Sequence, residues 1–224
     1  MEPLIISYYT SGTLYEKDAL ALQESCQKVG VEWDIEAVEL VGNWGENTCY
    51  KPEFILRKLL QHKRDLFWID SDAVLLQKPA LLDTIDCDLA VRIYPDREDR
   101  DPFKVNSGTI YVKHSPEAIA LLHTWIEVCQ SAIASCPPNE EVIDQVCLKA
   151  VLQHLPHKAR VQSLPPTYNA IFDAREDQFP PGEIVVRHYQ ASRLYKKFIN
   201  EGIFPFLQDL SIENLRDLRP RINY

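Results

Sequence analysis

Short apolar runs alternate with helix-like segments along most of this chain, and this alternation limits the possible fold more than any other feature of the sequence. Short apolar runs bounded by turn residues are typical of buried strands. Because parallel strands need long crossover connections, usually helices, the pattern predicts an α/β fold with a mostly parallel central sheet and helices on both faces.

The expected strands cover residues 4–9, 33–38, 66–69, 73–76, 89–94, 105–112, 159–163 and 184–187. The expected helices cover residues 15–29, 52–62, 116–135, 142–154 and 212–218, with a short helix beginning at Pro79. Residues 42–47 and 95–102 are expected to be loops, the first rich in Gly and Asn and the second highly charged.

Composition and charge exclude several classes of protein. The 224 residues are 46% hydrophobic and 25% charged, which is ordinary globular usage and excludes a disordered chain. The formal net charge of −9 argues against a general nucleic-acid binder, which needs a basic surface. The charge is unevenly distributed, because Lys and Arg outnumber Asp and Glu only after residue 186.

The sequence also allows predictions about the cellular location of the protein and the chemical state of its cysteines. No apolar run is longer than five residues, so we expect no transmembrane segment. The first residues lack the pattern of a signal peptide, and we expect a cytoplasmic protein. The six cysteines include no C-x-x-C pair, so we expect free thiols and no structural zinc site.

The strongest chemical signal is a pair of carboxylates, Asp70 and Asp72, directly after the wholly apolar run 66–69. In open α/β sheets, ligands bind at the carboxyl ends of strands, and residues two apart on a strand share a face. Two oxygen donors on one side suit Mg²⁺ or Mn²⁺. The alternative is a solvated turn, since Asp and Ser are common turn residues.

Three further segments could contribute to the same site. His188 follows the apolar run 184–187, where it is either a metal ligand or a hydrogen-bonded histidine. Asn106-Ser107-Gly108 lies inside a predicted strand, where a glycine marks the close approach of a ligand or a β-bulge. Asp144-Gln145 lies near the start of a predicted helix, where the helix dipole alone could explain the acid.

A basic cluster follows His188 and contains Arg187, Arg193, Lys196 and Lys197. Beside a metal ion, such a cluster could hold a diphosphate leaving group. The alternative is an ordinary solvated face.

Together these motifs resemble the GT-A-fold glycosyltransferases, which are nucleotide-diphospho-sugar transferases marked by a D-x-D motif. The likeness extends from the first strand to about Lys197 and depends on the joint order of several short motifs. Those motifs are Lys51-Pro52, Asp70-Ser71-Asp72, Val105-Asn106-Ser107-Gly108, Asp144-Gln145, Tyr168-Asn169 and His188.

The resemblance implies a single GT-A-like, Rossmann-type domain over residues 1–224. Its nucleotide-binding half would cover about residues 1–112 and its acceptor half about 113–224. It further implies Mn²⁺ or Mg²⁺ as cofactor, with Asp70, Asp72 and His188 as ligands. The implied residues for the nucleotide and donor are Tyr8, Tyr9, Thr10, Lys51, Arg57, Ser71, Asn106, Ser107, Gly108, Ser192, Arg193 and Lys196.

The implied reaction moves a sugar from a nucleotide donor, which we expect to be UDP-linked, to a hydroxyl of a saccharide, protein or lipid-linked acceptor. Asp144 and Gln145 are the implied catalytic pair. Asp144 could serve as the base of an inverting enzyme. However, an Asp-Gln pair in this place is more similar to the retaining members, so retention is favoured. The segment 95–102 matches no family motif and could shape the acceptor site.

Three alternatives compete with this interpretation. Residues 70–74 also fit the D-x-D-x-[TV] pattern of haloacid-dehalogenase-like phosphotransferases, with Asp70 as nucleophile, but 69 residues precede it and no later acid pair is evident. A sugar nucleotidyltransferase would need a Gly-rich, basic loop that residues 9–13 do not provide. The third alternative is a non-catalytic nucleotide-sugar-binding protein, because a fold does not fix an activity.

Overall fold

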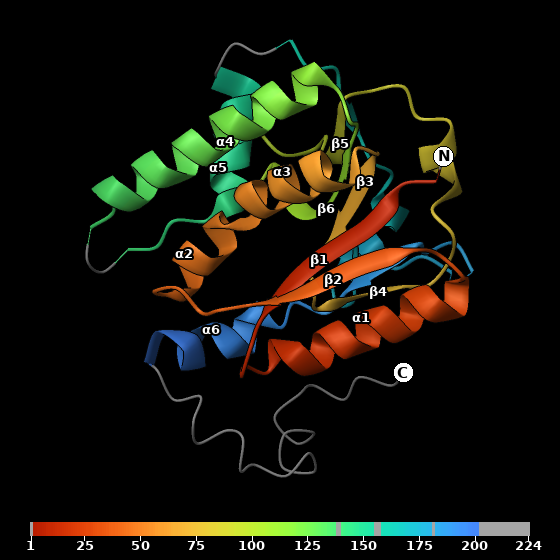
Figure 1. Cartoon of the computed structure of the whole chain (residues 1–224), viewed down its shortest axis with the longest axis horizontal. Helices are drawn as coiled ribbons and strands as arrows, with labels where there is room; N and C mark the ends of the chain where they lie inside the picture. Colours follow the sequence, from red (N-terminus) through yellow and green to blue (C-terminus); the bar gives the residue numbers. More distant parts are fainter. Residues whose placement is uncertain (1, 138–139, 155–157, 181, 202–224) are drawn as a thin grey trace.

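The computed structural model describes residues 2–137, 140–154, 158–180 and 182–201 (Figure 1). The strands are β1 (Leu4–Thr10), β2 (Trp33–Val38), β3 (Leu66–Ile69), β4 (Ala73–Leu75), β5 (Leu89–Ile93), β6 (Val105–Val112), β7 (Val161–Ser163), β8 (Ala170–Ile171) and β9 (Val186–His188). The α-helices are α1 (Tyr15–Val29), α2 (Trp44–Cys49), α3 (Lys51–His62), α4 (Pro116–Ser135), α5 (Asp144–His154) and α6 (Ser192–Glu201). Short 3₁₀ helices cover Ala80–Asp83, Pro166–Tyr168 and Arg175–Asp177.

The central sheet has six strands in the order β2-β1-β3-β6-β5-β7. All of its strands run in one direction except β6, which is antiparallel to both β3 and β5. The predicted α/β fold with a mostly parallel sheet is therefore confirmed. The reversal of β6 has a simple cause, because no helix lies between β5 and β6 to carry the chain back across the sheet.

A second sheet, which the sequence did not reveal, has three strands in the order β4-β9-β8. Strand β9 is antiparallel to β4, and Ala73 pairs with His188. This pairing brings a histidine from late in the chain next to the segment that follows β3.

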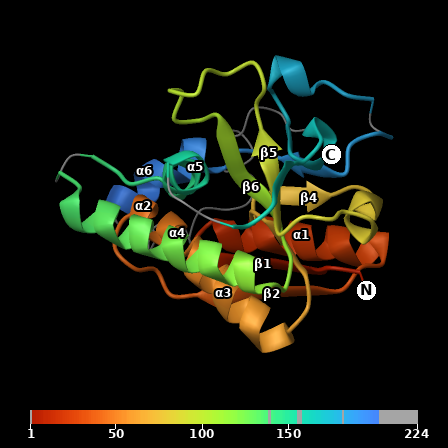
Figure 2. The ribbon, with the colours of Figure 1, turned by 90° about the horizontal axis from the view of Figure 1, so that it is seen from above.

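Alternating side chains on the central strands fill two cores. Ile6 and Trp68 point to the side covered by α3, α4 and α5, whereas Ile5 and Phe67 point to the side covered by α1 and the small sheet. Helices α3 and α4 lie side by side on the first of these faces (Figure 2). Sheets buried on both faces need apolar residues at successive positions, which explains the continuous run in β3.

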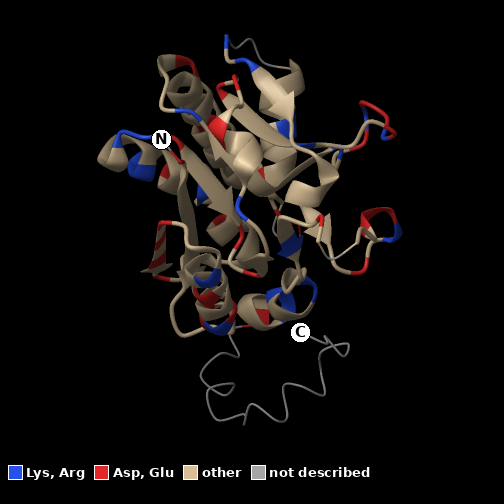
Figure 3. Cartoon of the chain, turned by 90° about the vertical axis from the view of Figure 1, so that its right-hand side faces the viewer, with Lys and Arg blue, Asp and Glu red and all other residues tan. Residues whose placement is uncertain are grey.

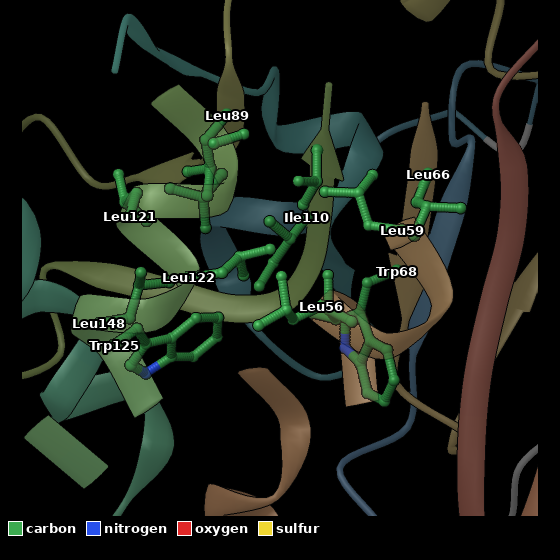
Figure 4. Packing of buried hydrophobic residues seen from close by; sticks show 14 of the residues in the cluster. Leu56, Leu59, Leu66, Trp68, Leu89, Ile110, Leu121, Leu122, Trp125 and Leu148 are labelled. Carbon is green, nitrogen blue, oxygen red and sulfur yellow. The ribbon is translucent and has the colours of Figure 1, made fainter. Parts of the chain in front are cut away.

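Helix α4 is the one helix in the described part of the chain that is long and apolar enough to cross a membrane by length and composition. In this fold, Leu122 and Trp125 of α4 are completely buried in the core beside Leu148 of α5 (Figure 4). The apolar side chains on this face of α4 therefore pack against the protein itself.

The structure corrects two local expectations. Residues 44–49 form helix α2, although 42–47 were expected to be a loop. The cause is a capping box, in which the Asn43 side chain accepts the Glu46 N–H and the Glu46 side chain accepts the Asn43 N–H. Helix α6 was not expected, and the expected helix over 212–218 lies outside the described residues.

Charged residues of both signs are interspersed over the side of the molecule drawn in Figure 3.

A buried ion pair between Arg92 and Asp177 connects the two sheets. Arg92 of β5 donates two hydrogen bonds to the Asp177 carboxylate, at 2.7 Å and 2.6 Å, and a third to the carbonyl of Asn169. Asp177 also accepts the N–H of Ile171 in β8. Because both charged side chains are almost fully buried, this pair depends on its own geometry rather than on water.

We expect Asp177→Asn to lower the free energy of unfolding by about 3–5 kcal/mol, because it leaves the Arg92 guanidinium buried without a counter-charge. Urea denaturation followed by circular dichroism measures the change. Asp86→Asn is the matched control, because Asp86 pairs with Arg160 at the surface and its loss should change stability little. An equal effect of the two substitutions would contradict the role given to the buried pair.

Candidate functional site

A cavity of about 360 Å³ lies at the carboxyl ends of β1 and β3. Most of the residues predicted from the sequence line it, from the end of β1 to the start of α6. They are Tyr8, Tyr9, Thr10, Lys51, Asp70, Ser71, Asp72, Asn106, Ser107, Gly108, Asp144, Gln145 and Ser192. This is the sheet edge where α/β folds bind ligands.

Asp70, Asp72 and His188 form a group of candidate metal ligands. One ligand atom of each lies within 4.8 Å of the others. Asp70 follows β3 directly, and a turn in which the Ala73 N–H donates to the Asp70 carbonyl leads into β4. The pairing of β4 with β9 then places His188 beside the two acids.

The electrostatics of this group fit a divalent cation. Burial and the negative charge of Asp70 raise the pKa of Asp72 to about 7. Burial, together with the positive charges of Lys51 and Arg92, lowers the pKa of His188 to about 3, so its imidazole is neutral. A neutral imidazole and two crowded carboxylates are a ligand set that Mn²⁺ and Mg²⁺ accept.

The His188 ring is held by a hydrogen bond between its Nε2 and the hydroxyl of Thr109, at 2.7 Å. Histidine ligands of metal ions are commonly oriented in this way through their second nitrogen. If Nε2 carries the proton, Nδ1 is the nitrogen that can bind a metal ion.

Lys51 lies between two acids and is almost completely buried, with 4% of its surface exposed. Its Nζ is 3.0 Å from Oδ1 of Asp70 and 2.9 Å from Oδ2 of Asp144, and it donates to the carbonyl of Ser107. Burial alone would lower the pKa of Lys51, but the charges of Asp144 and Asp70 raise it above its usual value. Lys51 therefore stays charged and holds the two carboxylates together.

Asp144 is as deeply buried as Lys51, with 4% of its surface exposed. Its carboxylate also accepts the Ser107 hydroxyl at 2.8 Å, and the neighbouring Gln145 side chain accepts the Ser107 N–H. Burial raises the pKa of Asp144, although Lys51 opposes the shift. The pair Asp144 and Gln145 thus fixes the position of β6 at the cavity.

Gly108 provides space that a side chain would fill. A Cβ at this position would lie 2.9 Å from Cε1 of His188, 3.1 Å from Asn106 and 3.2 Å from Asn169. The β-bulge suggested for this segment is present, because Val91 pairs with Ile110 whereas the next residue, Arg92, pairs with Asn106. The irregularity lets the backbone of Gly108 approach the histidine.

Four predicted residues do not line the cavity. His188 is buried behind Gly108, with 1% of its surface exposed, and the other three are cations. Arg57 pairs with Glu36 on the surface, Arg193 pairs with Asp173, and Lys196 pairs with Glu141 while its Nζ lies 4.9 Å from the centre of the Trp44 ring. The sequence shows their charge but not the acids that the fold brings beside them. In this structure these cations pair with acids that do not line the cavity, and their contacts with the donor stay a prediction.

Several lining residues were not named individually from the sequence, although Arg97 belongs to the segment 95–102 that was expected to shape the acceptor site. Trp44, Asn47 and Thr48 come from α2, whose capping box was the available signal. Arg97 and Phe103 come from the connection between β5 and β6. Tyr94 also lines the cavity, and the Cζ atoms of Arg92 and Arg97 lie 4.2 Å and 4.1 Å from the centre of its ring. Tyr15, Trp68, Ile143, Ile171, Gln190 and Ile199 complete the lining.

Comparison with known proteins decides the family. The sequence pattern of the nucleotide-diphospho-sugar transferases matches residues 48–187, which is more than half of the chain. The chain belongs to this family. It is therefore a glycosyltransferase that uses a nucleotide-sugar donor, and the phosphotransferase alternative is excluded. No curated protein matches the chain.

Solved structures support the fold. A glycosyltransferase involved in glycosylation of the major capsid of PBCV-1 is 17% identical, with a TM-score of 0.62, and the match covers 90% of this chain and 100% of that one. Galactosyltransferase LgtC, solved with donor and acceptor sugar analogs, is 12% identical, with a TM-score of 0.51 and coverage of 96% and 99%. GlyE of Streptococcus pneumoniae TIGR4 is 12% identical, with a TM-score of 0.51 and coverage of 97% and 63%. The glycosyltransferase thus has a GT-A fold, as the sequence predicted.

A double-mutant cycle tests the buried triad of Lys51, Asp70 and Asp144. We expect Lys51→Met to lower the free energy of unfolding by about 3–5 kcal/mol, because it leaves Asp144 buried without a counter-charge. Asp144→Asn should recover part of this loss in the double variant, so the two effects would not be additive. Urea denaturation gives all four values.

Arg57→Met is the control for the cycle. Its partner Glu36 is half-exposed, so the expected loss is below about 1 kcal/mol. Additive effects of the Lys51 and Asp144 substitutions would show that the two side chains do not interact as described.

Proposed function

We propose that this glycosyltransferase transfers a sugar from a UDP-sugar to a hydroxyl acceptor, with retention of configuration and with Mn²⁺ or Mg²⁺ held by Asp70, Asp72 and His188. The observation that carries the proposal is the convergence of two carboxylates that line the cavity and one neutral imidazole buried beside them.

The bound ion would neutralise charge on the diphosphate and stabilise its departure, which is the chemistry that a divalent metal supplies to such a reaction. The protein's part is to hold the ligands. Asp70 Oδ1 accepts hydrogen bonds from the Trp68 indole and from Lys51, and Asp72 Oδ2 accepts the Ala191 N–H. These contacts fix the direction of each carboxylate before a donor arrives.

The nucleotide end of the donor would bind among aromatic side chains. Tyr8 and Tyr9 of β1 and Trp44 of α2 line the cavity, and ring faces of this kind stack with nucleobases. The ring of Tyr8 packs against Trp68 and Phe54, with centroids 5.2 Å and 5.1 Å apart, so its position is set by the core.

Retention is supported by the state of Asp144. An inverting enzyme needs a carboxylate base that can reach the acceptor hydroxyl. The carboxylate of Asp144 is instead buried and engaged by Lys51 and Ser107, and Gln145 cannot act as a base. We assign these two residues to holding the segment that faces the donor sugar. Arg97 and Phe103, from a loop outside the family motifs, are assigned to the acceptor side.

We expect Asp70→Asn and Asp72→Asn each to abolish Mn²⁺-dependent binding of UDP, because each removes a charged ligand from the ion. Isothermal titration calorimetry with and without Mn²⁺ measures the effect. Asp83→Asn, at an exposed position outside the cavity, is the control and should bind UDP as the wild type does. Unchanged affinity in either ligand variant would refute the metal assignment.

Gly108→Ala tests the position of His188. The added methyl group would lie 2.9 Å from Cε1 of His188, so the ring must move. We expect the Mn²⁺-dependent affinity for UDP to fall about tenfold or more, which corresponds to a loss of about 1.4 kcal/mol or more of binding free energy. Gly182→Ala adds the same methyl group in open space and should change nothing. Equal UDP affinities of Gly108→Ala and Gly182→Ala would show that a side chain at position 108 does not displace His188 from a metal ion.

Catalysis itself is tested by a panel of nucleotide sugars in a thermal-shift assay, followed by donor hydrolysis on any hit. A bound donor should raise the melting temperature, and slow hydrolysis should release the sugar first as the anomer present in the donor, which NMR identifies. Release of the opposite anomer would contradict retention. Binding without transfer or hydrolysis would instead favour a non-catalytic sugar-nucleotide binder.

A further inference from the structure

Three of the six cysteines come together although they are far apart in the sequence. Cys49 ends α2, Cys129 lies in α4 and Cys147 lies in α5, and their sulfur atoms are within 4.8 Å of one another. All three are buried, with 6%, 1% and 4% of their surfaces exposed. All six cysteines of the chain lie in the described ranges as free thiols.

The environment of the three sulfurs is apolar. They belong to the core between the central sheet and helices α3, α4 and α5. Within the described residues, no His, Cys, Asp or Glu adds a fourth ligand atom within 4.8 Å of all three. Sulfur ligands in an apolar site select soft ions and disfavour Mg²⁺ or Mn²⁺.

The spacing is close to that of a metal–thiolate site. With metal–sulfur bonds of about 2.3 Å, three sulfurs around one ion lie about 4.0 Å apart. The observed upper limit of 4.8 Å therefore requires only a small inward movement of the side chains.

We propose that Cys49, Cys129 and Cys147 bind one soft, thiophilic metal ion, such as Zn²⁺ or Cu⁺, as three thiolates. The site is chemically distinct from the group of Asp70, Asp72 and His188, because its ligands are sulfur and its surroundings are dry. Binding displaces the thiol protons, so affinity increases with pH.

The position of the three-cysteine site gives binding a structural consequence. Cys49 is two residues before Lys51, and Cys147 is one helical turn after Asp144. Cys129 is one turn after Trp125, whose indole N–H donates to the Asp144 carbonyl. An ion bound here joins α2, α4 and α5 directly behind the buried Lys51 pair, and it stabilises the folded chain by binding the native state.

The test uses Cd²⁺ as a probe, because thiolate ligation gives an ultraviolet charge-transfer band that carboxylate ligation does not. Reduced wild-type protein titrated with Cd²⁺ should give this band with an end point of one ion per chain, and excess Mn²⁺ should not remove it. Cys129→Ala and Cys147→Ala should lose the band at that end point. Cys136→Ala removes a partly exposed cysteine outside the cluster and should keep it.

Thermal melting supplies a second measurement. Cd²⁺ should raise the melting temperature of the wild type and of Cys136→Ala, and should leave that of the cluster variants unchanged. If the alanine variants do not fold, Cys129→Ser and Cys147→Ser replace them, and the wild-type titration decides independently. A wild type without the band, or a band that only Cys136→Ala abolishes, would overturn the proposal.

Discussion

The buried ammonium of Lys51 is the interaction on which the rest of the site depends. It neutralises Asp70 at the end of β3 and Asp144 at the start of α5, and it donates to the Ser107 carbonyl in β6. Without this cation, two carboxylates and the strand between them would meet at one place with uncompensated charge, which is very unfavourable in a buried environment. One residue at the start of α3 thus makes it possible for two strands and a helix to converge at the cavity.

The group of candidate metal ligands depends equally on the joining of the two sheets. Asp70 and Asp72 follow a strand of the central sheet, whereas His188 belongs to the small sheet. The buried pair of Arg92 and Asp177 connects the sheets. Because Gly108 has no side chain, the His188 imidazole can lie close to the backbone of β6. The geometry of a three-residue site therefore rests on contacts between residues that are 80 to 115 positions apart in the chain.

The sequence predicted those parts of the fold that depend on local pattern. Asp70 and Asp72 could be placed at a sheet edge because an apolar run of uniform character ends directly before them. The partners of Arg57 and Lys196 could not be predicted, because Glu36 and Glu141 approach them only in the folded chain. Trp44 was missed because Gly and Asn residues suggested a loop, although the capping residues were present. The cluster of three cysteines left no trace in sequence spacing, since each cysteine comes from a different helix.

The proposed reaction requires Asp70, Asp72 and His188 to hold a divalent ion that binds the diphosphate of the donor. Anomalous X-ray diffraction at the manganese absorption edge, from crystals grown with Mn²⁺ and UDP, locates such an ion. We expect an anomalous peak about 2.0–2.5 Å from a carboxylate oxygen of each aspartate and from the His188 ring, and also in contact with the diphosphate. Ordered UDP in the cavity without a manganese peak at these residues would contradict the proposed metal site.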